Sequence, residues 1–70
     1  MTPLDDRLLA AHARDDRAAL VGLYTQAADS ASTLDAACFY LTHAYVFALE
    51  LGDARARDLH ARLVAEGREA

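Results

Sequence analysis

The chain has 70 residues, which is room for a single domain. Eleven acidic residues outnumber seven arginines and give a net charge of −4. This balance argues against nucleic-acid binding, which needs a clustered basic stripe, because the arginines here are interleaved with acids. The only cysteine, Cys38, excludes an internal disulfide and a cysteine-based zinc site.

Ala and Leu dominate the apolar residues, and Ile and Trp are absent, which favours helices over strands. The first predicted helix covers about residues 3–13. Thr2 offers a capping oxygen, Pro3 has the backbone angle of a first helical turn, and Asp5 places a carboxylate near the positive end of the helix dipole. Its apolar stripe consists of Leu4, Leu8 and Ala11.

The second predicted helix covers about residues 16–31. Asp15 and Asp16 are the candidate caps at its start. The residues of one face are apolar while the opposite face is polar, which is typical of an amphipathic helix. The apolar face consists of Leu20, Leu23, Tyr24, Ala27 and Ala31.

The third predicted helix covers about residues 33–51. Ser32 and Thr33 with Asp35 form a start similar to a capping box, and Gly52 ends the helix. At 100° per residue its apolar side chains cover well over half of the circumference, so we expect neighbours on two sides. Those side chains form two rows, Leu34, Cys38, Leu41, Tyr45 and Ala48, then Ala37, Tyr40, Ala44, Phe47 and Leu51, together with Ala36 and Leu49.

The fourth predicted helix covers about residues 54–66, with Asp53 as its cap and Asp58 paired to Arg62 on its outer face. Its buried stripe contains Ala56, Leu59 and Leu63, with His60 and Val64 as further candidates. The connections between all four helices are short, so consecutive helices should be antiparallel neighbours. The predicted fold is therefore all-α, a small bundle of four short antiparallel helices made of two helical hairpins that share the third helix.

The segment around Gly52 resembles a known family. Residues 44–53 read AYVFALELGD and are followed by Ala56, which is similar to the turn between the paired helices of a tetratricopeptide repeat. A weaker echo of this pattern lies 38 residues earlier, at Asp15, Arg17 and Ala18. The resemblance covers about half of the chain, and it implies a scaffold for protein contacts that has no chemistry of its own.

Two large apolar residues lie in the polar wedge of the third helix, where water is expected. Phe39 and Val46 stand there seven residues apart, with His43 at their rim. Exposed aromatic residues with polar edges are typical of interfaces, so these three residues are the candidate partner-binding site, for another protein or a second copy in a homodimer. The alternative is that the first helix or an ordered tail covers them.

A second hypothesis is a small-ligand-binding or enzyme-accessory domain with a pocket near Tyr45 and His60. The simpler expectation is that these two rings touch across the Gly52 turn. His12 and His43 complete the set of histidines, but no two histidines have a chelating spacing, so no metal or other cofactor is expected.

No residue pattern predicts catalysis. Cys38 lies on an apolar row and is expected to be a small buried hydrophobe, because a nucleophile needs a neighbouring base. The sequence contains neither a basic start followed by an apolar run nor a spanning segment. We therefore expect a non-enzymatic cytoplasmic protein that contacts no membrane.

Overall fold

The computed structural model describes residues 2–68 and has four helices. They are α1 (Pro3–Ala13), α2 (Arg17–Ser30), α3 (Leu34–Leu51) and α4 (Arg55–Ala65). The predicted all-α fold is confirmed, and each helix begins and ends within a residue of its prediction. The small shifts arise because Asp16 and Thr33 are caps outside their helices, where each side chain accepts a backbone N–H bond three residues later.

The helix starts correct two details of the sequence analysis. Thr33 caps α3 alone, without the reciprocal bond predicted from Asp35, whereas a complete capping box forms at Thr2 and Asp5. Asp53 is not the N-cap of α4, because Ala54 occupies that position. The Asp53 carboxylate still accepts the Arg55 backbone N–H at 2.8 Å and so binds one of the free amides at this helix start.

Gly52 ends α3 in the way predicted. Its φ of +65° lies in the left-handed region, which a residue without a Cβ adopts at little cost. Its N–H bonds back to carbonyls of the last helical turn, and the chain reverses into α4.

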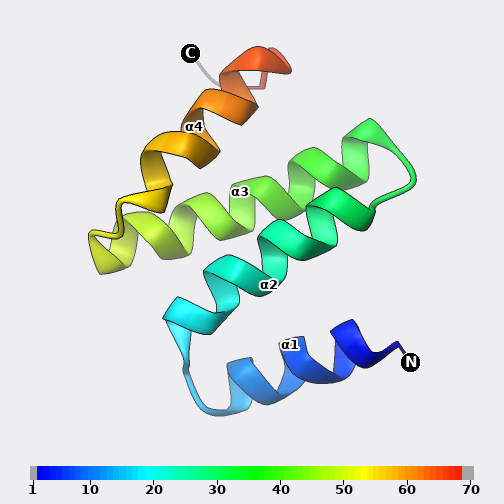
Figure 1. Cartoon of the computed structure of the whole chain (residues 1–70), viewed down its shortest axis with the longest axis vertical. Coiled ribbons are helices and arrows are strands. Elements are labelled where there is room, and N and C mark those ends of the chain that lie inside the picture. Colours follow the sequence, from blue (N-terminus) through cyan, green and yellow to red (C-terminus); the bar gives the residue numbers. More distant parts are fainter. Residues whose placement is uncertain (1, 69–70) are drawn as a thin grey trace.

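The four helices form a flat arrangement rather than a round one. Figure 1 shows them side by side in chain order, and the Cα atoms span 32 × 29 × 11 Å. Within residues 2–68, backbone packing joins only successive helices, α1 to α2, α2 to α3 and α3 to α4, with the closest association between α2 and α3. The sequence left the position of α1 open; it docks on α2.

Two apolar clusters hold the layer together. One joins α2, α3 and α4 and includes Val21, Leu41 and Leu63, each at most 2% exposed. The other joins α1 to α2 through Ala11, Leu20 and Leu23. Two further side chains, Tyr24 and Phe47, pack against both clusters and so connect the two halves of the molecule.

The burial of α2 and α3 differs from the prediction. Leu34, Leu49 and Leu51 were expected inside, but they are 51%, 55% and 44% exposed, so neighbours enclose less of α3 than predicted. Conversely, α2 buries Val21 and Ala28, which lie off its predicted face. The reason is that α2 has a neighbour on each side, α1 and α3, and therefore needs a second apolar stripe.

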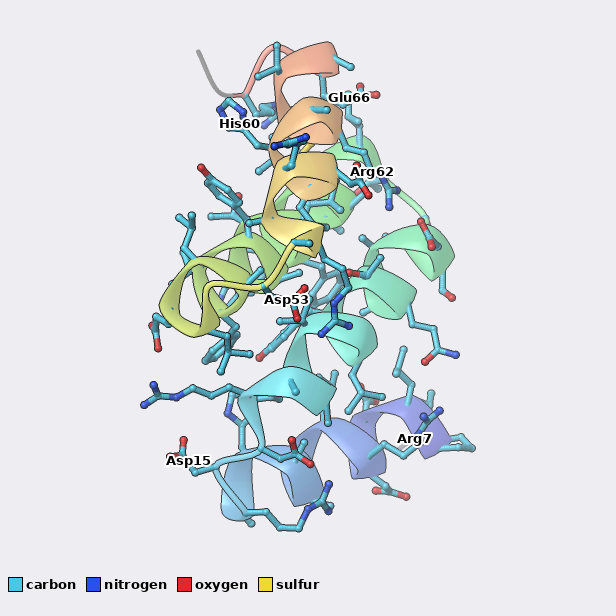
Figure 2. All side chains as sticks on the ribbon, turned by 60° about the vertical axis from the view of Figure 1, so that its left-hand side comes forward. Arg7, Asp15, Asp53, His60, Arg62 and Glu66 are labelled. Carbon is cyan, nitrogen blue, oxygen red and sulfur yellow. The ribbon has the colours of Figure 1, made fainter. Side chains whose placement is uncertain are left out.

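An ion pair between α4 and α2 forms in place of the ion pair that was predicted within α4. Arg62 donates to Asp29 of α2 at 2.7 Å rather than pairing with Asp58. Figure 2 shows Arg62 and His60 on opposite sides of α4. Exposed pairs of this kind add at most about 1 kcal/mol, so apolar packing, and not charge, must supply most of the stability.

Candidate functional site

The three predicted partner-binding residues lie together on the outer face of α3. Phe39 is 59% exposed, Val46 is 44% exposed, and His43 lies half-buried between them. Spacings of four and three residues place them on one stripe of the helix, over a length of about 10 Å. We call these three residues the α3 outer surface. The first helix does not cover it, because α1 packs on α2.

His43 is held in a defined orientation. Its Nδ1 lies 2.9 Å from the Phe39 carbonyl oxygen, and since a carbonyl only accepts, Nδ1 carries the proton. The imidazole also lies 4.5 Å from the Phe39 ring and stacks on the Tyr24 ring at 5.0 Å, measured between ring centroids. His43 thus supports the exposed Phe39 ring on one side and connects it to the interior on the other.

Tyr24 is the centre of an aromatic group that spans three helices. It stacks on Phe47 at 6.0 Å, and its hydroxyl lies 2.8 Å from Nε2 of His12 on α1. Partial burial raises the pKa of the Tyr24 hydroxyl above its usual value, and Tyr40 adds to the effect. The contact between His12 and Tyr24 was not predicted, because no periodicity or spacing in the sequence relates residue 12 to residue 24.

Acidic residues flank the α3 outer surface, and arginines of the same chain pair with them. Asp35 at the start of α3 accepts from Arg68 at 2.6 Å, and Glu50 near its end accepts from Arg17 at 3.2 Å. Each carboxylate therefore has a cation beside it, and the stripe between them carries no net charge when His43 is neutral. An uncharged apolar stripe favours association with another apolar surface over recognition of a charged ligand.

The predicted contact between Tyr45 and His60 is confirmed. The two rings stack with centroids 5.5 Å apart and an angle of 30° between their planes. This contact fills the space between the rings, so the hypothesis of a pocket there gains no support from the geometry. Figure 2 shows His60 projecting from α4 on the side away from Arg62.

Cys38 matches its simpler interpretation. It is buried in the α2, α3 and α4 cluster as a small hydrophobe. In the part of the chain that the structure describes, no three His, Cys, Asp or Glu side chains gather in a way that would hold a metal ion. Of the helices within residues 2–68, none has the length and apolar character needed to cross a membrane.

Comparisons with protein-family models, with curated proteins and with solved structures found no match. The tetratricopeptide-like character of the Gly52 turn therefore stays a prediction from the sequence.

Proposed function

We propose that this protein is a non-catalytic, tetratricopeptide-like helical interaction module that self-associates through the α3 outer surface. The observation that carries the proposal is the exposure of Phe39 and Val46 on a helix whose opposite side is packed. Large apolar side chains grouped on one exposed stripe are typical of binding surfaces, whereas isolated ones are common on any protein. We also propose the cytoplasm as its compartment, since its single thiol, Cys38, is unpaired.

The charge around the stripe favours a second copy as the partner. Two identical surfaces meet about a twofold axis so that residue i of one contacts residue j of the other, which brings the acidic Asp35 end of one stripe to the acidic Glu50 end of the other. The pairs Asp35–Arg68 and Glu50–Arg17 balance the charges at both ends of the stripe and reduce this repulsion. With α3 antiparallel to its copy and His43 near the axis, Phe39 of one chain would pack on Val46 of the other.

The size of the molecule gives such a dimer a clear advantage. A stable interface buries about 800 Å² on each partner. That area is roughly a fifth of the 4376 Å² that this chain exposes as a monomer. Because a single core of this size supplies only about 3–5 kcal/mol of stability, burial of a further apolar stripe would add substantially to it.

The test is the mass in solution, measured by sedimentation equilibrium over a wide range of concentration. We expect a monomer–dimer equilibrium for the natural chain and a monomer for Phe39→Asp, because an aspartate at the interface centre would bury an unpaired charge. A natural chain that stays monomeric at the highest concentration would overturn the proposal.

Two further variants make the result specific. Leu9→Asp is the matched control, because Leu9 is 58% exposed but lies on α1, and this variant should dimerise normally. Val46→Glu should dissociate the dimer as Phe39→Asp does. Far-UV circular dichroism of each variant should retain the helical spectrum, and loss of that spectrum in both α3 variants would show that the stripe is core and not interface.

A further inference from the structure

A second surface, separate from the α3 outer surface, is a basic groove between α1 and α2. It has a volume of about 490 Å³, three arginines line it, and no acidic residue does. The arginines are Arg7 of α1, Arg14 at the C-cap of α1 and Arg55 of α4, and the small residues between them are Ala10, Ala18, Ala19 and Gly22. Such a concentration of cations is unexpected on a chain with a net charge of −4.

Arg55 is held in place over this groove. Its Nε and Nη2 donate to the two carboxylate oxygens of Asp53, at 3.0 and 2.7 Å. Nη2 also donates to the Ala18 carbonyl oxygen at 3.3 Å. The other terminal nitrogen, Nη1, lies over Gly22. Figure 2 shows Asp53 in the turn above the first residues of α2. A donor fixed in this way loses little freedom when it binds an anion.

Arg7 and Arg14 differ in their partners. Arg14 lies 3.4 Å from Asp16, a long and exposed contact, whereas Arg7 has neither an ionic nor a hydrogen-bonding partner among residues 2–68. They are seven residues apart on one face of α1, which separates them by about 10 Å along the helix axis. On an extended chain of the polyproline II type, which has three residues per turn, two carboxylates three residues apart lie on the same side and are separated by nearly the same distance, about 9 Å.

Gly22 is a second feature that indicates a binding role for the groove, because it weakens α2 without a packing reason. A glycine inside a helix costs roughly 1 kcal/mol relative to alanine, and packing does not require it here, because an added Cβ would meet only Arg55 Nη1 at an ordinary 3.6 Å. The glycine does leave the α2 backbone open in the groove, below Arg55 Nη1. Residues that lower stability without a packing reason are typical of binding sites.

We propose that this groove binds an extended acidic segment of a partner protein, with Arg7, Arg14 and Arg55 as its carboxylate ligands. The segment lies along α1 and passes close to the backbone at Gly22. Arg7 and Arg14 suit this role because the planar donors of a guanidinium group match carboxylate oxygens in pairs. Arg55 contributes a single donor, Nη1, because Asp53 and the Ala18 carbonyl occupy its Nε and Nη2. Gly22 in the groove and Tyr24 are two residues apart, which corresponds to a turn of about 200° around α2, so they lie on opposite sides of this helix. The α3 outer surface contacts the Tyr24 side of α2, and a segment bound in the groove therefore leaves it accessible.

Fluorescence anisotropy with a labelled peptide that carries two glutamates three residues apart tests the proposal. We expect saturable binding that weakens about tenfold for Arg7→Gln and about tenfold for the same peptide with glutamines. Added salt should weaken it further. Gly22→Ala should raise the melting temperature and yet weaken binding, a combination that a purely structural role for Gly22 would not produce.

Matched controls separate this site from general charge effects and from the proposed dimer. Arg57→Gln removes an exposed arginine of α4 outside the groove and should bind the peptide like the natural chain. Phe39→Asp should also bind normally, so that failure of the dimer proposal does not affect this one. The proposal is overturned if the glutamate peptide does not bind, or if it binds no better than the glutamine peptide. It is also overturned if Arg7→Gln binds the peptide as tightly as the natural chain does, or if the groove binds inorganic phosphate through Arg7 but does not bind the peptide.

Discussion

Replacement of Gly22 by alanine should stabilise the domain, whereas the same replacement at Gly52 should destabilise it. Gly22 is exposed and lies inside α2, where alanine is favoured by about 0.5–1 kcal/mol, and an added methyl group would contact only Arg55 Nη1 at 3.6 Å. At Gly52 nothing lies within 4 Å of an added methyl group, so space is not the obstacle. The obstacle is the φ of +65°, which costs an L-residue about 1 kcal/mol or more.

The assay is thermal and urea unfolding followed by circular dichroism. For a domain of this size, 1 kcal/mol corresponds to about 4–8 °C in melting temperature, so the two variants should move in opposite directions by several degrees. All proteins should be compared at one concentration, because self-association would raise the apparent stability. A melting temperature for Gly22→Ala equal to or below that of the natural chain would refute the placement of Gly22 on an exposed helical face.

Two other variants test the core and the start of α4. Leu63 is fully buried, so Leu63→Ala should cost about 2–5 kcal/mol, which is comparable to the whole stability of the domain, and circular dichroism at 25 °C should show a largely unfolded chain. Hydrogen bonds from Arg55 lower the pKa of Asp53 from 3.8 to about 2, so the stabilisation from its charged form is present above pH 4 and is lost as the pH falls toward 2. The melting temperature of Asp53→Asn should therefore fall less over that interval than that of the natural chain, and identical falls would contradict the assigned contact.

The sequence predicted the helices well because their signals are local. Pro3 and the Thr2 cap mark the start of α1, and Gly52 marks the end of α3; each acts within one helical turn and depends little on the rest of the chain. The exposure of Phe39 and Val46 could also be predicted, because residues seven apart on a helix share a face whatever the helix packs against.

The features that the sequence did not predict depend on how helices are placed in space. Leu34 and Leu49 continue apolar rows, yet they are exposed because α4 covers only part of α3. Arg62 pairs with Asp29, 33 residues away, because α4 reaches across toward α2. The basic groove likewise joins Arg7 and Arg55 from helices far apart in the chain, and no spacing rule relates such positions.

The order in which the helices pack in the flat layer determines how local unfolding spreads through the molecule. The backbone of each terminal helix packs against one neighbour, and side chains such as His12 of α1 and Arg62 of α4 reach the next helix. We therefore expect α1 to detach from α2, and α4 from α3, while the α2–α3 pair stays intact. Amides at the two ends of the chain should consequently exchange with solvent before those in the middle. The rings of Tyr24 and Phe47, which touch both apolar clusters, are the route by which loosening of α1 weakens the central pair.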